Sequence, residues 1–165
     1  MEPTELLGTA AQVAITLAGF AGVVVVFGSA AVHEWSPVDK FRLRLMLQSA
    51  SFALALSMIA LVLVASDLSR PLVWQLASGL VAVTLLSGLM GTMTTFRRFS
   101  PDELSRTGAS KVVFYVTGAT GFALVGLQVV NAALLAQFWL LYLAIVLSIL
   151  VALLQFVRLI FSRRG

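Results

Sequence analysis

Amide side chains inside long apolar runs are the residues of this sequence with the most evident capacity for chemistry. They are Gln12, Gln48, Gln128, Asn131 and Gln155. Each amide has four hydrogen-bonding sites, which are hard to satisfy in a tight apolar interface. A polar group in hydrocarbon costs free energy unless it finds a partner. We therefore expect these side chains to face protein or water rather than lipid.

Hydroxyl side chains recur at helical spacing, in stripes along one face of a helix, and most of these stripes also include one of the amides. The members of these stripes are Thr16, Thr84, Ser87, Thr117, Thr120 and Ser148. Such stripes have two interpretations. Small and hydroxyl residues commonly hold membrane helices together, within one chain or between protomers. Alternatively, they line a wet path without charged groups, which would select weakly among ions.

Ionisable groups are missing from the middles of the apolar runs. The chain has one His, at position 33, and no Cys. Proton relays and ion-coupled carriers usually place ionisable groups at membrane depth, and zinc sites are built mainly from Cys and His clusters. We therefore expect no enzymatic activity, no catalytic residues, no bound cofactor and no metal site.

The composition predicts the elements that position these residues. The chain of 165 residues is 60% hydrophobic and 11% charged, with mean hydropathy +1.03, whereas soluble domains carry about 25% charged residues. A membrane-crossing helix needs about 20 apolar residues. The sequence thus predicts a single all-α membrane domain over 1–165, a bundle of five transmembrane helices over about 6–31, 44–66, 72–95, 112–134 and 138–160, with a short interfacial segment near 101–107.

The basic residues predict the orientation of this bundle. All of the 11 Lys and Arg except Arg70 fall in the first loop, the third loop or the C-terminal tail. Five crossings put those three segments on one side, and the positive-inside rule makes that side the cytoplasm. We expect the N-terminus outside and the C-terminus inside a bacterial inner membrane. Trp35, Trp74 and Trp139 fall at the ends of predicted spans, where indoles prefer the interface.

The third loop is the most basic segment. Its cations could contact anionic lipid headgroups or serve only as an orientation signal; they are Arg97, Arg98, Arg106 and Lys111. The clusters are not interleaved with aromatic residues as single-stranded nucleic acids require. The expected partner is therefore the lipid bilayer, with no nucleic acid.

Helix-start signals predict that the second helix begins near Pro37, before its apolar run, so that its first turns extend the helix on the cytoplasmic side. Ser36 is a good N-cap, Pro37 suits the first helical position and Asp39 follows in the first turn.

The run Leu17–Gly22, then Trp35 and the segment Asp39–Arg44, resembles an AGFAG…W…DxFRLR pattern of small uncharacterised multi-pass bacterial membrane proteins. The resemblance covers the first third of the chain and implies no activity or site.

These observations lead to one functional expectation and one alternative. A small apolar bundle with polar stripes on most helices is expected to self-associate, and we expect a homo-oligomeric channel or pore-like transport protein. The alternative is a non-catalytic subunit or assembly factor of a larger inner-membrane complex, which would bind other membrane proteins.

Overall fold

The computed structural model describes residues 2–27, 32–99 and 111–161. Over these residues the chain is helical, and the connections between helices are short. The elements are α1 (Pro3–Phe27), the 3-10 turn η1 (Val32–Glu34), α2 (Pro37–Val64), α3 (Arg70–Phe96), α5 (Lys111–Val130), the π-helix η2 (Asn131–Leu135) and α6 (Phe138–Phe161). The predicted interfacial segment at 101–107 lies outside the described residues.

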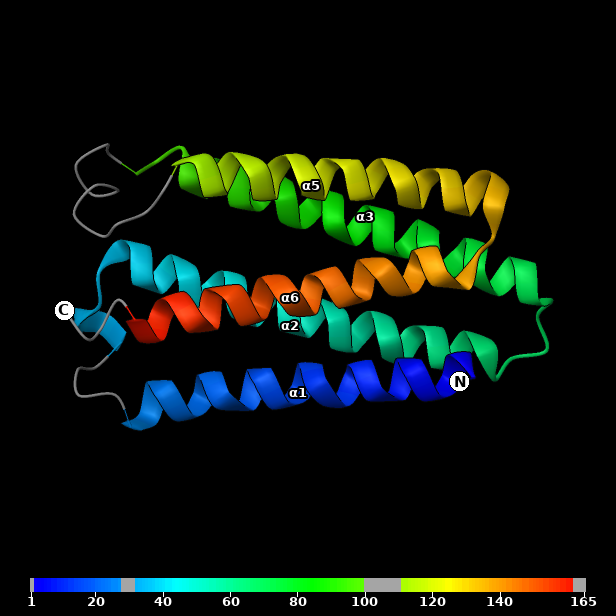
Figure 1. The fold of residues 1–165 in the computed structure, drawn as a ribbon, viewed down its shortest axis with the longest axis horizontal. Coiled ribbons are helices and arrows are strands. Elements are labelled where there is room, and N and C mark those ends of the chain that lie inside the picture. The colour runs from blue at the N-terminus through cyan, green and yellow to red at the C-terminus, as the bar shows by residue number, and fades with distance from the viewer. Residues whose placement is uncertain (1, 28–31, 100–110, 162–165) are drawn as a thin grey trace.

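Five of these helices are long and apolar enough to cross a membrane, with stretches of 21 to 28 residues. The predicted all-helical class and the five apolar helices are therefore confirmed. The helices run antiparallel to their chain neighbours, so the described ends of the chain lie at opposite ends of the bundle (Figure 1).

The start of α2 follows the predicted capping pattern. The Ser36 hydroxyl accepts the Asp39 backbone N–H at 3.1 Å and donates to the Asp39 carboxylate at 2.8 Å. Asp39 also holds the Arg42 guanidinium at 3.0 Å, and Arg42 is only 6% exposed. The helix therefore begins at Pro37, well before its apolar run, and its first turn is stabilised by three side chains.

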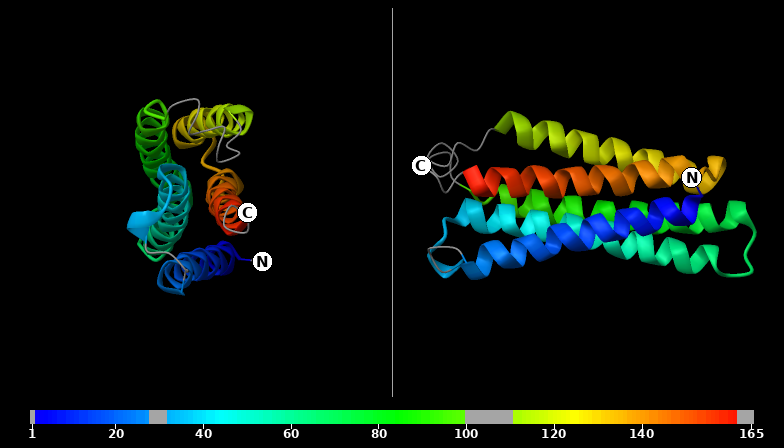
Figure 2. Two further views of the ribbon diagram at one scale, coloured as in Figure 1. Left: turned by 90° about the vertical axis from the view of Figure 1, so that its left-hand side faces the viewer. Right: turned by 60° about the horizontal axis from the view of Figure 1, so that its bottom comes forward.

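Helices α2 and α6 form the centre of the bundle. Helix α1 packs against both of them on one side, while α3 and α5 pair on the other (Figures 1 and 2). The α1–α2–α6 contact is rich in alanine, with Ala14, Ala53 and Ala144 almost fully buried. Small side chains let helix backbones approach closely, which increases van der Waals contact in the absence of a hydrophobic driving force.

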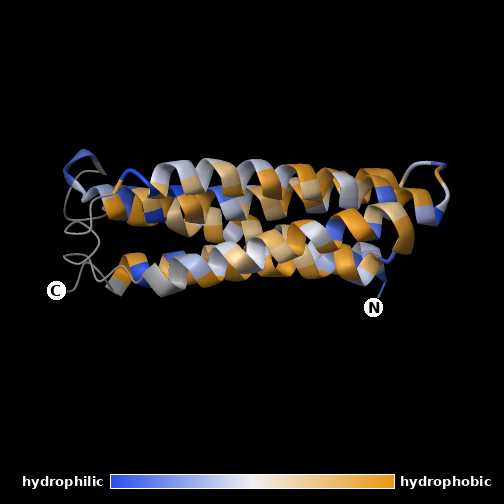
Figure 3. Cartoon of the chain, turned by 90° about the horizontal axis from the view of Figure 1, so that it is seen from above, coloured by the Kyte–Doolittle hydropathy of each residue, from blue (hydrophilic) through white to orange (hydrophobic). Residues whose placement is uncertain are grey.

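The lateral surface of the bundle is apolar. Exposed large side chains include Val62, Val83 and Leu134, at 67%, 67% and 77% exposure, while hydrophilic residues gather at the two ends (Figure 3). An apolar belt of this extent is the surface expected to face lipid.

The tryptophans differ from the expected pattern. Trp139 is 60% exposed near the start of α6, as an interfacial indole would be. Trp35 and Trp74 are each 6% exposed, and Trp74 packs on Phe138 with ring centroids 5.0 Å apart. These two indoles lie near helix ends but pack inside the bundle.

Candidate functional site

The Asn131 side chain stabilises the turn between α5 and α6 through hydrogen bonds. Its Nδ2 donates to the Ser78 hydroxyl of α3 at 2.7 Å and to the Gln137 carbonyl at 3.0 Å. Its Oδ1 accepts the Gln137 backbone N–H at 2.8 Å. The side chain is 0% exposed. One amide therefore connects three segments: the end of α5, the turn into α6 and the first third of α3.

The turn itself requires this support because its backbone is unusual. The π-helix that starts at Asn131 ends at Ala136, whose φ of 52° is left-handed. The Ala136 N–H donates to the Asn131 carbonyl at 2.9 Å. A left-handed conformation costs a residue with a Cβ roughly 1–2 kcal/mol, so surrounding contacts must hold it in place.

Gln128 makes a second bridge near the same turn. Its Nε2 donates to the Leu140 carbonyl of α6 at 2.8 Å, and the side chain is 0% exposed. Its Oε1 accepts no hydrogen bond from the residues that the structure describes. Gln128 and Asn131 thus make interhelix and turn contacts inside the bundle, and neither borders an open path within one chain.

Most of the predicted hydroxyl groups bond within their own helices. Thr16 donates to the Gln12 carbonyl at 2.7 Å and Thr120 to the Val116 carbonyl at 2.9 Å. The hydroxyls of Ser87 and Ser148 do the same, to the carbonyls of Thr84 and Ala144, respectively. A hydroxyl bonded to the preceding turn needs no water and no second helix. The stripes therefore do not in themselves require a wet path.

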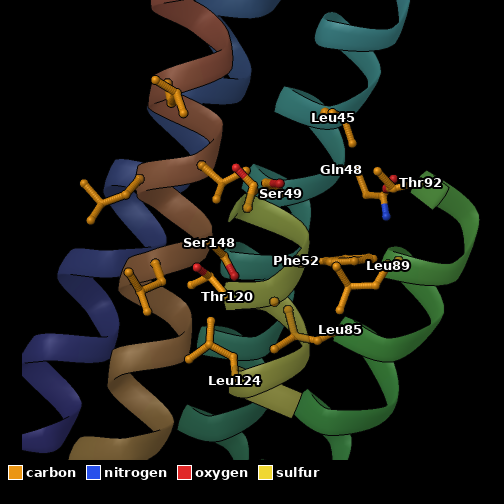
Figure 4. A pocket seen from close by; sticks show the side chains of 17 residues that line it. Leu45, Gln48, Ser49, Phe52, Leu85, Leu89, Thr92, Thr120, Leu124 and Ser148 are labelled. Atoms are coloured by element: carbon orange, nitrogen blue, oxygen red, sulfur yellow. The ribbon is translucent and has the colours of Figure 1, made fainter. Parts of the chain in front are cut away.

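A groove with a cavity volume of about 260 Å³ lies among α2, α3, α5 and α6 (Figure 4). It brings together four of the predicted residues. They are Gln48 of α2, Thr117 and Thr120 of α5, and Ser148 of α6. Ser49 and Thr92 add hydroxyls, and the remaining wall is mostly leucine, together with Phe52.

The groove exists because α5 leans on α3 and diverges from α6 away from their shared turn (Figures 1 and 2). Two glycines permit the close contacts that set this lean. A Cβ on Gly121 would lie 2.6 Å from Leu89 Cδ2, and a Cβ on Gly88 would lie 2.7 Å from Gln48 Nε2 and 2.8 Å from the Phe52 ring. A larger residue at either position would therefore force the Leu89, Gln48 or Phe52 side chain to shift.

The groove has a neutral, mostly apolar lining. Its described lining contains hydrocarbon, hydroxyls and one amide, with no Asp, Glu, His, Lys or Arg. Over the described parts of the chain, no group of three His, Cys, Asp or Glu residues comes together that could hold a metal ion. Such a lining suits an apolar or neutral molecule.

The remaining predicted residues point in different directions. Gln155 is buried on α6 at 7% exposure, and Thr84 is half-buried on α3. Gln12 and Thr16, in contrast, are exposed on the outer face of α1. Gln12 lies nine residues after Pro3, which is about 14 Å along the helix. Its side-chain amide thus lies in the middle third of an apolar helix, on the outside of the bundle.

The outer face of α1 that carries Gln12 combines three glycines with exposed apolar side chains such as Ile15 and Val23, which are 56% and 51% exposed. Gly8, Gly19 and Gly22 lie three to seven residues from one another or from Gln12, and so share its side of the helix. A Cβ added at any of these glycines would meet nothing within 4 Å. We call Gly8, Gln12, Gly19 and Gly22 the α1 outer face.

The predicted lipid-contacting cations are only partly described. Arg97 and Arg98 are exposed at the end of α3. Arg106 lies outside the described residues, and for Lys111 the structure describes the backbone of α5 alone. Arg98 shares a pocket with Lys40 and Arg44 from the start of α2. Sequence reasoning did not link these cations, although the four-residue spacing of Lys40 and Arg44 places them on one helix face.

Comparison with protein-family models, with curated proteins and with solved structures finds no match to this chain.

Proposed function

We propose that this chain is a homo-oligomeric membrane protein that associates through the α1 outer face and provides a path for ions or small neutral solutes between protomers. The observation that carries the proposal is the outward amide of Gln12. An amide in hydrocarbon is costly without a hydrogen-bonding partner, and a second polar face would supply one.

The small residues beside Gln12 support the same association. Gly8, Gly19 and Gly22 leave open space beside exposed apolar side chains such as Ile15 and Val23, so side chains of another helix could pack into the gaps, as small residues allow in membranes. When Gln12 faces Gln12 across a symmetry axis, the amides can bond each other or bind water. The hydroxyls of Thr9 and Thr16 adjoin this face and bond to their own helix.

The path is placed between protomers because the two fully buried amides, Gln128 and Asn131, already donate hydrogen bonds within the chain. Gln128 and Asn131 bond within the chain and are 0% exposed. A lining of neutral amides and hydroxyls without a charged ring gives weak ion selectivity. We further propose the orientation with the N-terminus outside and the C-terminus inside, in a bacterial inner membrane, because the described cations at the ends of α2, α3 and α6 share one end of the bundle (Figure 1).

The α1 outer face also suits the alternative, in which it docks on a different membrane protein and the chain is a non-catalytic subunit or assembly factor. Both functions need the same polar contact at Gln12. They differ in what lies opposite, and an experiment in membranes separates them.

Site-specific cross-linking is direct because the chain has no cysteine. Gln12→Cys is expressed in membranes and oxidised; a disulfide forms when two Cα atoms come within about 7 Å. We expect a covalent homodimer. Val83→Cys on α3, which is 67% exposed, is the matched control and should remain monomeric. Equal cross-linking of both variants would reflect random collision and contradict the α1 interface.

Flux and pulldown measurements decide between channel and subunit. Reconstituted protein should pass small solutes, and Gln12→Leu should reduce the flux. An oligomer that passes nothing would refute the path. Recovery of another membrane protein in fixed ratio, with no homodimer at Gln12→Cys, would establish the subunit function instead.

A further inference from the structure

A pocket with three cations lies where the first turns of α2 meet the last turn of α3. Its volume is about 440 Å³, and it is lined by Lys40 and Arg44 of α2 and by Arg98 just beyond α3. These cations come from segments more than fifty residues apart in the sequence. We call this site the cation pocket.

Aromatic side chains form the wall between the cations. Phe41 packs edge-on against Phe99, with ring centroids 5.4 Å apart, and contacts Phe96 at 6.4 Å. Phe41 and Phe99 both line the pocket, as do Pro37 and Thr95. The pocket therefore combines an apolar wall with charged groups at its edge, as a site at a membrane boundary would.

The positive charge of the pocket is not balanced by the described carboxylates. Asp39, the nearest acid in sequence, is held by Ser36 and by Arg42. The ion pairs among the described residues are Arg42–Asp39 and His33–Glu34, and neither includes a pocket cation. Lys40 donates one hydrogen bond, at 2.8 Å, to the His33 carbonyl, and an ammonium has two further N–H donors.

The chemistry that suits this arrangement is a phosphate group. Guanidinium groups bind phosphate oxygens with paired, charge-assisted hydrogen bonds, and a lysine adds a point charge. Free phosphate and a lipid headgroup share this chemistry. The pocket lies at the ends of two helices with apolar surfaces. This position favours a lipid headgroup over free phosphate, because the acyl chains of the lipid could then lie along those helices.

We propose that the cation pocket binds the phosphate of an anionic phospholipid through Lys40, Arg44 and Arg98. This site is independent of the α1 outer face and does not depend on the proposed transport function. It also distinguishes Arg98 from its neighbour Arg97, which is exposed and does not line the pocket.

Native mass spectrometry of the full chain in mild detergent measures the binding. The probes are phosphatidylglycerol and phosphatidylcholine at equal concentration, and inorganic phosphate as competitor. We expect preferential retention of phosphatidylglycerol. Each charge near a membrane surface contributes enough to change affinity about fivefold, so Arg98→Gln should reduce the preference about fivefold, and Lys40→Gln with Arg44→Gln and Arg98→Gln about a hundredfold.

The matched control is Arg97→Gln, which removes the same charge one residue away. It should leave the preference nearly unchanged. Equal losses in Arg97→Gln and Arg98→Gln would show diffuse surface charge and overturn the pocket, as would a triple variant that keeps the preference. Displacement of the lipid by inorganic phosphate at equal concentration would show a soluble phosphate site and overturn the lipid assignment. Because the three cations are exposed, the variants should fold; if the triple variant does not, the Arg97 and Arg98 pair still decides.

Discussion

Replacing Asn131 with leucine should destabilise the turn between α5 and α6 and so lower the free energy of unfolding. Leucine nearly matches the shape of asparagine but removes three hydrogen bonds, to the Ser78 hydroxyl and to both backbone groups of Gln137. Interhelix hydrogen bonds in membrane proteins contribute about 0.6 kcal/mol on average and about 1.7 kcal/mol at most. Three of them give a loss of about 2 to 5 kcal/mol in the free energy of unfolding, the upper part being expected because the site is fully buried.

The assay is unfolding of the purified protein in mixed micelles with increasing dodecyl sulfate, followed by loss of helical circular dichroism. Gln137→Leu is the matched control, because its exposed side chain makes one described hydrogen bond, to the Leu135 carbonyl. That variant should lose under about 1 kcal/mol. A double-mutant cycle of Asn131→Leu with Ser78→Ala isolates a single bond, and its coupling should be about 0.6 to 1.7 kcal/mol.

Two results would refute the reasoning. The first is an Asn131→Leu variant as stable as the parent, or no coupling to Ser78, since then the amide does not fasten the turn. The second comes from labelling Asn131→Cys with a water-soluble maleimide in the folded protein. A side chain with 0% exposure should not react, so rapid labelling would reveal a water path through the chain at this position.

Three further predictions concern the backbone and the orientation. Ala136→Gly should raise the free energy of unfolding by about 1 kcal/mol, because φ at this position is 52° and glycine adopts that conformation without strain. The control Ala133→Gly, in the π-helix just before Ala136, should instead lower the free energy of unfolding by about 1 kcal/mol. Equal effects of the two substitutions would exclude a conformational cause. Ser36→Ala should cost about 1 kcal/mol, because the side chain caps α2 at Asp39, whereas Ser36→Asp, which retains an acceptor, should cost less in the same assay. Reporter tags at the two termini should report opposite compartments, with the C-terminus in the cytoplasm; a shared compartment would contradict an odd number of crossings.

The helical class and the helix starts could be read from the sequence because they depend on local chemistry. Long apolar runs require a nonaqueous environment, and in hydrocarbon the helix satisfies its own backbone. The start of α2 at Pro37 is confirmed, since Ser36 and Asp39 act within one turn. The predicted spans 112–134 and 138–160 leave a short connection between them, and the chain turns there through η2 and Ala136.

The direction in which each polar stripe faces could not be read from the sequence. Gln12 and Asn131 are both amides in apolar helices with small neighbours, and periodicity treats them alike. In the structure Asn131 is buried and donates a hydrogen bond to Ser78, whereas Gln12 is exposed. The difference depends on which helices lie beside α1 and α5, which is a matter of long-range packing.

The sequence by itself determined the apolar character of the helices, their number and the end of the bundle where the cations gather. These properties follow from composition and from the positions of charged residues along the chain. Only the tertiary structure decided that α5 leans away from α6 to leave a groove, that Lys40 and Arg44 meet Arg98, and that Trp74 is buried against Phe138. The groove lies beside close contacts between helices at Gly88 and Gly121. Such contacts join segments far apart in the chain, and no local pattern encodes which segments will meet.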